Sequence, residues 1–232
     1  QGLRGKGVGR LLTLPFTLLS ATMAAIKVIR SHQIDMVVGF GGYVTAPGGI
    51  AARLTGTPLI IHEQNAIAGM SNRYLAKISN KVLQAFEGTF AHSQPSTTLE
   101  TVGNPVRNTI TGVAAPIDRY DLNDPSPLKL LVVGGSLGAQ ILNETVPRAL
   151  ALLERPFAVR HQCGRDNETA TIAAYQNENL AAHEYKVQPF IDDMAAAYNW
   201  ADIIVCRAGA LTVTEIQNVG VAAIFVPLPQ AV

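Results

Sequence analysis

Short apolar segments recur along the chain, and helix-like or glycine-rich segments separate them. The apolar segments are rich in valine, isoleucine and leucine. They predict strands at residues 35–40, 58–61, 81–85, 98–102, 129–134, 157–162, 185–188, 202–206 and 222–226. Strands that alternate with helices are typical of α/β folds, and from residue 128 onward the repeat predicts a parallel sheet of the doubly wound type.

A glycine-rich turn follows the predicted strand Leu130–Val133. Gly134, Gly135 and Gly138 allow a sharp turn and close approach to a ligand, and Ser136 offers a hydroxyl where the next helix begins. Free N–H groups and the positive end of the helix dipole favour an anion there, most simply phosphate. A tight turn without a ligand is the alternative, but so many glycines favour phosphate.

A second turn of this kind lies at 39–49 and leads into a helix whose start Pro47 marks. The chain therefore has two possible phosphate cradles. The strand at 58–61 ends where open α/β sheets place their ligands, and four polar residues stand there: His62, Glu63, Gln64 and Asn65. A lone histidine is commonly structural, whereas four polar residues together favour function. Ser71 is expected to cap the short helix that follows.

The glycines after the strand at 129–134 differ from the dinucleotide fingerprint, which needs G-x-G-x-x-G and an acid at the end of the next strand. Glu154 has a suitable sequence distance, but it is expected in the helix before the strand at 157–162, and that strand ends without an acid. NAD binding is therefore the weaker hypothesis. A nucleotide with one ribose fits better.

Helix boundaries are marked in the last third of the chain. Asp192 and Asp193 suit a helix N-terminus, and Gly220 suits a helix end. Thr212 and Glu215 have the spacing of a capping box, in which the glutamate would bond a backbone N–H. An equal alternative is that Glu215 holds the vicinal hydroxyls of a ribose.

Length and composition set the domain organisation. The chain has 232 residues, of which 48% are hydrophobic and 15% charged, which suits one large or two medium α/β domains. We expect domains at 1–107 and 128–232 and a linker at 108–127. Cys163 and Cys206 lack metal-ligand spacing and indicate free thiols, while the net charge of +1 does not point to nucleic acid. The abrupt start and end predict a fragment of a longer protein.

Leu11–Ile29 is an apolar, helical segment that Ser and Thr interrupt too often for it to span a bilayer. The first acid is Asp35, and five bases precede it: Arg4, Lys6, Arg10, Lys27 and Arg30. A core helix is the favoured interpretation for most of this segment. The other is an apolar patch that rests on an anionic membrane surface.

Six motifs occur in order: GFGGYVTAPGG at 39–49, HEQN at 62–65, GNPVR at 103–107, VGGSLGA at 133–139, FIDDM at 190–194 and CRAGALTVTE at 206–215. Together they closely resemble the MurG family, bacterial transferases that add N-acetylglucosamine to the lipid-linked muramyl-pentapeptide of peptidoglycan synthesis. The resemblance covers essentially the whole chain. It implies the GT-B architecture, with two Rossmann-like parallel-sheet domains facing each other across a cleft, here truncated at both termini.

By position, the resemblance implies a UDP-N-acetylglucosamine site that lies mostly in the second domain. Ser136 would bind donor phosphate, Ile191 would lie against the uracil, Arg207 would shape the base pocket and Glu215 would take the ribose hydroxyls. The diphosphate and sugar would lie along Ala210, Leu211, Thr212, Val213 and Thr214. Asn65 and Arg107 would reach the donor from the first domain.

On the acceptor side, the resemblance implies that Gly41, Gly42 and Tyr43 hold the lipid pyrophosphate, and that His62 and Asn72 line the cleft. The reaction would invert the anomeric carbon and need no metal or cofactor. The family's usual base candidate and a Gln-rich donor loop would lie outside this sequence. His62 is then the catalytic histidine that the chain offers.

The partners implied are UDP-N-acetylglucosamine, the undecaprenyl-linked muramyl-pentapeptide and an anionic membrane surface, with no nucleic acid. The location implied is peripheral, on the cytoplasmic face of the bacterial inner membrane. Two alternatives stay open: another GT-B sugar-nucleotide enzyme, such as an epimerase or a transferase to a soluble acceptor, and a non-catalytic nucleotide-binding fragment. The uncharged helix and early basic run speak against a wholly soluble acceptor.

Overall fold

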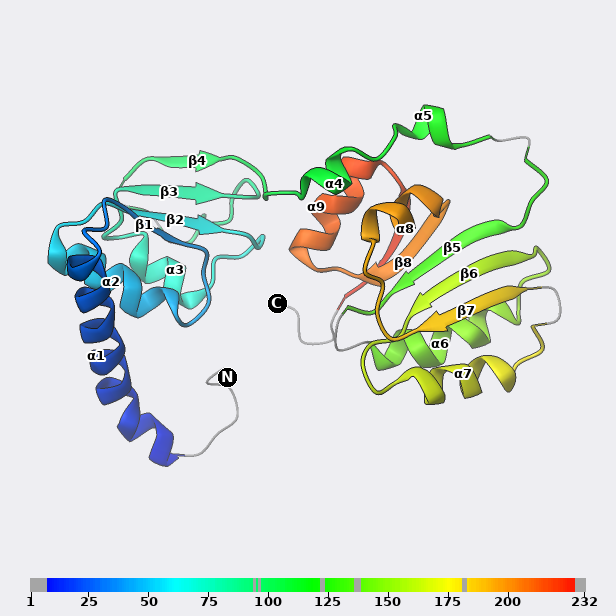
Figure 1. The fold of residues 1–232 in the computed structure, drawn as a ribbon, viewed down its shortest axis with the longest axis horizontal. Coiled ribbons are helices and arrows are strands. Elements are labelled where there is room, and N and C mark those ends of the chain that lie inside the picture. Colours follow the sequence, from blue (N-terminus) through cyan, green and yellow to red (C-terminus); the bar gives the residue numbers. More distant parts are fainter. Residues whose placement is uncertain are drawn as a thin grey trace. The chain divides into compact units, whose positions relative to one another are not determined.

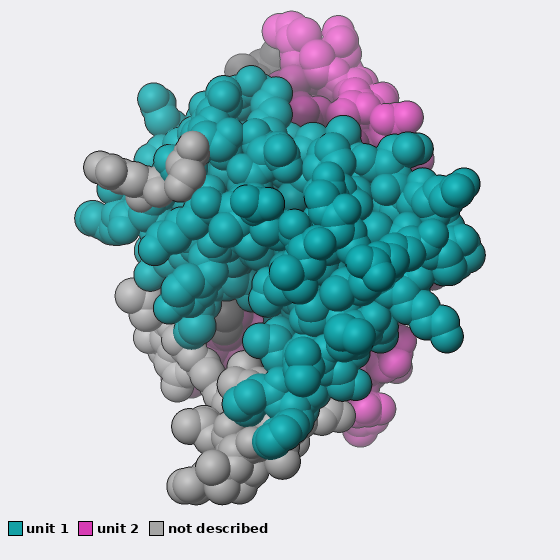
Figure 2. Space-filling view, turned by 90° about the vertical axis from the view of Figure 1, so that its left-hand side faces the viewer, with its two compact units in different colours: residues 1–104 teal, residues 105–232 magenta. Residues whose placement is uncertain are grey.

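The chain forms two compact units, unit 1 (residues 1–104) and unit 2 (residues 105–232), in a computed structural model (Figures 1 and 2). The structure describes residues 8–93, 95, 97–121, 124–135, 139–180 and 183–227, with the backbone only for residues 8–14. Each unit has its own parallel sheet and its own apolar core.

Unit 1 contains a four-stranded parallel sheet in the order β1-β2-β3-β4. Its strands are β1 (Val37–Gly39), β2 (Leu59–Glu63), β3 (Lys81–Gln84) and β4 (Leu99–Thr101), and its helices are α1 (Val8–Ser31), α2 (Thr45–Thr55) and α3 (Met70–Leu75). The core joins Ile61 of β2 to Ala51 of α2 and Leu75 of α3. A Cβ at Gly49 would lie 2.5 Å from Cδ2 of Leu75, so a glycine is what lets α2 and α3 pack this closely.

Unit 2 contains a five-stranded parallel sheet in the order β7-β6-β5-β8-β9. The strands are β5 (Leu128–Val133), β6 (Phe157–Gln162), β7 (Glu184–Gln188), β8 (Ile203–Arg207) and β9 (Ala222–Val226). The helices are α4 (Asn108–Thr111), α5 (Pro116–Arg119), α6 (Gln140–Leu150), α7 (Glu168–Gln176), α8 (Met194–Trp200) and α9 (Ala210–Val219).

Both faces of the unit 2 sheet are covered, because successive side chains of a strand point to opposite faces. Leu130 and Val132 of β5 pack in a cluster with residues of α6 and α7, whereas Leu131 and Val133 pack in another with residues of α8 and α9. The doubly wound parallel sheet predicted for this part of the chain is therefore confirmed.

Residues expected to form a linker include α4 and α5, and both helices pack on unit 2. Ile110 of α4 is buried in the core beside α8 and α9. The Arg119 guanidinium donates to the carbonyls of Tyr198 at 3.2 Å and Val219 at 2.8 Å. The domain bounds 1–107, 108–127 and 128–232 remain predictions.

The predicted strands are all present in the structure, with ends that differ by at most two residues. Gly220 ends α9 with φ of 70°, as expected, and Asp193 caps α8 by accepting from the N–H of Ala196 at 2.9 Å. The expected cap at Ser71 is wrong, because α3 begins one residue earlier and Gly69 holds the N-cap position. No helix among the described residues is long and apolar enough to cross a membrane.

Candidate functional site

The carboxyl ends of β5 and β8 lie side by side in the unit 2 sheet. Val133 is in register with Cys206, so the turn at Gly134 and Gly135 lies next to the turn between β8 and α9. From β5 the chain runs outward through β6 and β7, and it returns to the other side of β5 with β8. This is the topological switch point, where open α/β sheets bind their ligands.

Two features suit this edge of the sheet to an anion. Gly135 has φ of 84°, a conformation that favours glycine, and it is exposed. The first N–H to bond within α9 is that of Val213, which donates to Gly209 at 2.9 Å. No described side chain caps the helix, so the N–H groups of the three residues before Val213 can face a ligand. The predicted contact at Ser136 lies outside the described residues.

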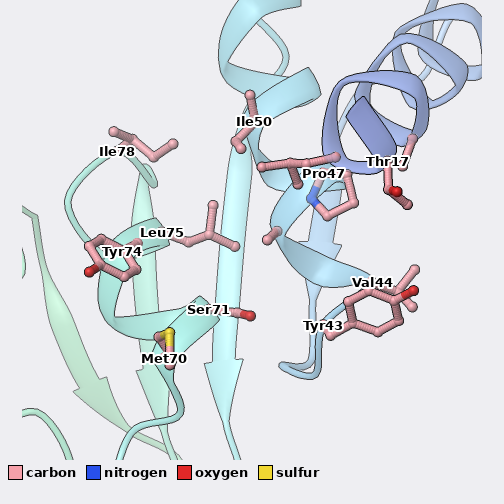
Figure 3. A pocket seen from close by; sticks show the side chains of 13 residues that line it. Thr17, Tyr43, Val44, Pro47, Ile50, Met70, Ser71, Tyr74, Leu75 and Ile78 are labelled. Carbon is pink, nitrogen blue, oxygen red and sulfur yellow. The ribbon is translucent and has the colours of Figure 1, made fainter. Parts of the chain in front are cut away.

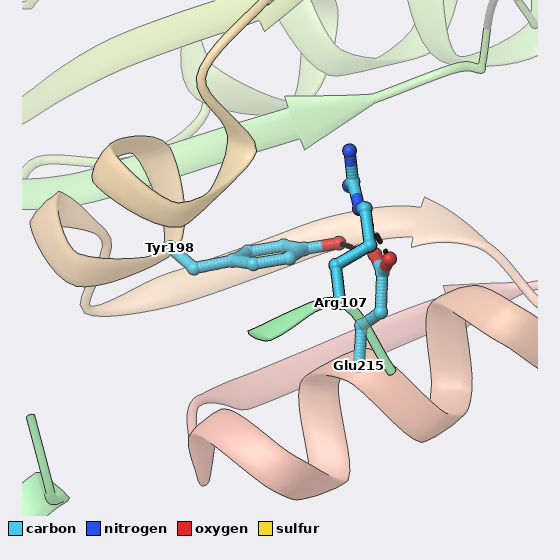
Figure 4. A network of polar contacts seen from close by, with 3 residues as sticks. All are labelled: Arg107, Tyr198 and Glu215. Carbon is cyan, nitrogen blue, oxygen red and sulfur yellow. Dashed lines mark hydrogen bonds and ion pairs between the residues drawn. The ribbon is translucent and has the colours of Figure 1, made fainter. Parts of the chain in front are cut away.

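The Glu215 side chain, on the second turn of α9, is held by two neighbours (Figure 4). The Tyr198 hydroxyl of α8 donates to Glu215 Oε2 at 2.9 Å, and the Arg107 guanidinium lies 3.4 Å from Oε1. The Tyr198 side chain is buried, and burial together with the Glu215 carboxylate raises the pKa of its phenol, so it remains a donor. The capping box is wrong, since α9 begins at Ala210 and Glu215 bonds a tyrosine instead of a backbone N–H.

Two further residues predicted to contact the donor make contacts within the protein itself. Arg207 ends β8, and its guanidinium donates to the carbonyl of Pro227 at 3.0 Å. Ile191 is buried in the core with Tyr198 and Ile204, while the neighbouring Phe190 is half exposed. The first turn of α9 carries the remaining predicted contacts, of which Leu211 is exposed and the others are half-buried: Ala210, Thr212, Val213 and Thr214.

In unit 1, the loop after β2 is organised by the buried carboxylate of Glu63. Its Oε1 accepts from the backbone N–H and the side-chain amide of Asn65, at 3.0 and 2.9 Å. Its Oε2 accepts from the N–H of Gly69 and the side-chain amide of Asn72, both at 2.9 Å. Predicted donor and acceptor residues, Asn65 and Asn72, are thus fixed by one carboxylate.

The glycine turn after β1 lies beside this loop. Gly41 and Gly42 have φ of 79° and 76°, and the Thr45 hydroxyl donates to the Gly41 carbonyl. A Cβ at Gly41 would lie 3.3 Å from the side-chain amide nitrogen of Asn72, so the two loops touch. Between them lies a cavity of about 200 Å³, which both Gly41 and Gly42 line. The Tyr43 side chain is half exposed at the rim of a larger apolar groove.

His62 is nearly enclosed by the fold, with 4% of its surface exposed. Its Nε2 lies 2.9 Å from the Gly103 carbonyl, which can only accept, so Nε2 carries the proton. Nδ1 then has a lone pair, and it has no hydrogen-bond partner among the described residues. The Phe40 ring lies 5.7 Å from the imidazole, centroid to centroid.

The apolar groove of unit 1 lies among α1, α2 and α3 and has a volume of about 470 Å³ (Figure 3). Its lining is mostly apolar and comes from all three helices, as Leu18, Pro47, Ile50, Tyr74 and Leu75 show. Among the described residues, no group of three or more His, Cys, Asp or Glu side chains is placed to hold a metal.

Comparison with known families decides where these two units belong. The model of the glycosyltransferase family 28 N-terminal domain matches residues 1–84, and that of the family 28 C-terminal domain matches residues 129–232. The chain belongs to glycosyltransferase family 28. The GT-B fold expected from the sequence is confirmed at the level of its two parallel-sheet α/β units.

Within family 28, the chain belongs with MurG, as its motifs predicted. It is 79% identical over 232 residues to a Psychrobacter arcticus protein named UDP-N-acetylglucosamine–N-acetylmuramyl-(pentapeptide) pyrophosphoryl-undecaprenol N-acetylglucosamine transferase. A protein of the same name from Acinetobacter baumannii is 51% identical over 236 residues. Each match covers the whole of this chain. It covers 64% of the first relative and 63% of the second, so the chain spans less than two thirds of their length.

Solved structures agree with the family 28 assignment. The crystal structure of Acinetobacter baumannii MurG has a TM-score of 0.81 and 45% identity, covering 98% of this chain and 63% of that one. A Neisseria meningitidis UDP-GlcNAc 2-epimerase, solved with UDP-GlcNAc, has a TM-score of 0.62 at 11% identity, covering 90% of this chain and 63% of its own, which shows a shared fold alone.

Two residues of this family 28 chain matter to the candidate site although the sequence did not single them out. Glu63 was noticed only as one of four polar residues, and Tyr198 was not noticed at all. Tyr198 bonds a partner 17 positions away, whereas Glu63 bonds residues that follow it by two to nine positions. The roles predicted for individual donor and acceptor residues remain predictions.

Proposed function

We propose that the protein carrying this chain transfers N-acetylglucosamine from UDP-N-acetylglucosamine to the 4-hydroxyl of a lipid-linked muramyl-pentapeptide, converting lipid I to lipid II. The observation that carries the proposal is the 79% identity, over the entire chain, to a relative named for this reaction. The anion-binding edge of unit 2 and the apolar and glycine-rich surfaces of unit 1 suit the two substrates.

The donor belongs to unit 2. The turn at Gly135 and the start of α9 present N–H groups to the diphosphate, while Glu215 accepts from the ribose hydroxyls. Arg107 neutralises the same carboxylate at 3.4 Å and is largely exposed, so it can swing toward the donor phosphates when the ribose arrives.

The reaction is a direct displacement. The acceptor hydroxyl attacks the anomeric carbon from the face opposite UDP, and the N–H groups at the start of α9 stabilise the charge that builds on the departing diphosphate. A base takes the proton of the attacking hydroxyl. His62 is the candidate on this chain: its protonated Nε2 leaves a lone pair on Nδ1, which is buried here, so the role requires the loops around it to open when the acceptor binds.

We further propose that unit 1 rests on an anionic membrane, on the cytoplasmic face of the bacterial inner membrane, where peptidoglycan synthesis serves cell shape and division. The exposed apolar side chains of α1 support this, with Phe16 74%, Leu19 61% and Met23 59% exposed. Lys27 and Arg30 are exposed on the same helix, and such basic residues attract anionic lipid.

The test is a transfer assay with labelled UDP-N-acetylglucosamine and lipid-linked muramyl-pentapeptide, using a protein of the relatives' full length that carries this sequence. Glu215→Ala should raise the KM for the donor by about tenfold, the loss expected when hydrogen bonds to a charged group disappear. Glu184→Ala, an exposed acid on β7 of the same unit, is the matched control. Absence of transfer, with UDP binding indifferent to Glu215→Ala, would sink the proposal. Release of a free N-acetylhexosamine without acceptor would favour an epimerase instead.

A further inference from the structure

We infer that the groove among α1, α2 and α3 binds the isoprenoid chain of the acceptor, so that the lipid next to the diphosphate leaves the bilayer and lies on the protein. The inference rests on the proposed function, because it assumes a lipid-linked acceptor. It adds a second, apolar subsite to that substrate.

The shape and lining of the groove suit one apolar chain. Its volume of about 470 Å³ falls within the range of small-ligand pockets. Pro47 and Ile50 of α2 lie between Thr17 of α1 and Tyr74 of α3 (Figure 3). Leu18 and Ala21 of α1 also line the groove. The walls are helices, whose backbone groups bond internally, so the groove offers no strand edge to a peptide.

The groove and the smaller cavity between the two loops of unit 1 are neighbours that share lining residues. Met70 and Ser71, at the start of α3, line both the groove and the cavity. Beyond them, the cavity is lined by Gly41, Gly42 and Asn72. A ligand that spans both spaces must be polar at one end and apolar along the other, as an isoprenoid diphosphate is.

The rim of the groove exposes large apolar side chains to water, which is unfavourable unless a ligand covers them. Val44 is 74% exposed, Met70 75% and Tyr74 67%, and they surround the opening together with other apolar residues. Large exposed apolar patches on a folded domain mark interaction sites. A protein partner would need a far larger contact than this groove provides, whereas a branched hydrocarbon chain can fill it.

The experiment compares acceptors that share the muramyl-pentapeptide diphosphate but carry either the full undecaprenyl chain or a single isoprene unit. Ala21→Phe places a ring in the groove. Ala24→Phe makes the same change on an exposed position of α1 that does not line the groove, and so controls for helix propensity and added apolar surface. Both are assayed in detergent, in a protein of the relatives' full length.

We expect Ala21→Phe to lower kcat/KM for the undecaprenyl acceptor by about tenfold, as when roughly two methylene groups are no longer buried. The short acceptor should be used equally by Ala21→Phe and the parent, which also shows that the variant folds. Ala24→Phe should match the parent on both acceptors. Ile50→Phe, in the α2 lining of the groove, repeats the test should Ala21→Phe not fold.

If neither Ala21→Phe nor Ile50→Phe changes transfer to either acceptor, the groove does not bind the isoprenoid chain. The proposed transferase activity would be unaffected by that result. A loss that is equal for both acceptors also overturns the inference, because the ring would then act on the sugar or diphosphate. Failure of the parent to use either acceptor counts against the transferase itself.

Discussion

The two carboxylate oxygens of Glu215 in unit 2 have different surroundings. Glu215 Oε2 accepts from the buried Tyr198 hydroxyl, while Oε1 meets a largely exposed arginine. The tyrosine restrains the rotation of the carboxylate and leaves Oε1 on the side of the exposed arginine. If Glu215 holds the ribose as proposed, Tyr198 is expected to be a positioning residue.

Tyr198→Phe should weaken UDP binding although the side chain touches no ligand. Loss of the hydrogen bond frees the carboxylate to rotate, at a cost of about 1 kcal/mol, or roughly a fivefold rise in Kd. Calorimetric titration with UDP and with 2′-deoxy-UDP separates this role from a loss of folding. Discrimination between the two nucleotides should shrink in Tyr198→Phe and persist in Tyr175→Phe, which alters another buried tyrosine of the unit. Unchanged discrimination in Tyr198→Phe would contradict the positioning role.

His161, at the end of β6, predicts a pH dependence of stability. Its ring bonds Tyr175 and Asn143, each at 3.0 Å, and burial lowers its pKa to about 4 from 6.5. Between these values the unfolded chain binds the proton and the folded chain does not. Stability should therefore fall by up to about 3 kcal/mol as the pH drops from 6.5 to 4.

Urea unfolding across that range measures the effect. His161→Gln cannot titrate, so its stability should vary less with pH between 4 and 6.5 than that of the parent. His92→Gln removes an exposed histidine and should retain the parent's slope. Parallel profiles for His161→Gln and the parent would exclude the effect.

Glu215 and Glu63 show why the contacts of single residues are hard to predict from sequence. Thr212 and Glu215 have the spacing of a capping box, and the pattern alone left a cap and a ligand equally possible. The structure excludes the cap, because α9 begins at Ala210 and Glu215 bonds a tyrosine on another helix, while the ribose contact remains a prediction. Glu63 likewise gains its role only when the loop after β2 folds back upon it.

At the scale of elements, α9 has an uncapped start and directly follows β8, one of the two strands at the switch point. Gly209 has extended backbone angles, and a Cβ there would lie 3.6 Å from Thr212 Oγ1. Natural helices commonly have Asp or Asn at this position. The open start is therefore compatible with a ligand that supplies the missing acceptor.

Gly209→Asp should stabilise the fold and weaken the binding of UDP. The carboxylate caps α9, which raises stability by a few tenths of a kcal/mol, on the order of 0.3. It also places a negative charge where the diphosphate binds, so Kd should rise at least about tenfold. Gly209→Asn caps the helix without the charge and serves as the control. Thermal melts and UDP titrations give the two readings, and equal Kd values for both variants would argue against an anion site at α9.

Elements were predicted far better than contacts. Strands were found because a parallel strand buried on both faces is a continuous apolar run, as in Leu130–Val133. The short helices α4 and α5 were missed, since Pro, Asp and Asn at 108–127 are typical of a linker. Arg119 holds that segment through carbonyls of Tyr198 and Val219, which lie far away in sequence.

At the scale of the whole molecule, the two units carry separable properties. The basic and apolar surface lies on α1 of unit 1, whereas the uncapped helix start and the glycine turn that suit an anion lie in unit 2. Membrane attachment and nucleotide binding should then respond to different substitutions.

The double variant Lys27→Glu with Arg30→Glu should bind anionic vesicles more weakly, by about 2 kcal/mol for the loss of two surface bases. The parent's binding should fall with salt, because the attraction is screened. Sedimentation with phosphatidylglycerol vesicles measures it, and UDP affinity should not change. Arg165→Glu with Lys186→Glu applies the same charge change to exposed residues of unit 2 and should leave vesicle binding intact. Equal binding by the two double variants would refute the assignment to unit 1.

The uncapped start of α9 also has a consequence for inhibition. Its N–H groups belong to the peptide backbone, and they are present whichever side chains the first turn carries. An inhibitor that bonds these amides, in place of the side chains around them, meets a target that most single substitutions cannot remove. Escape would require a proline or a shifted helix start, and either change would also remove the N–H groups that we propose hold the leaving diphosphate.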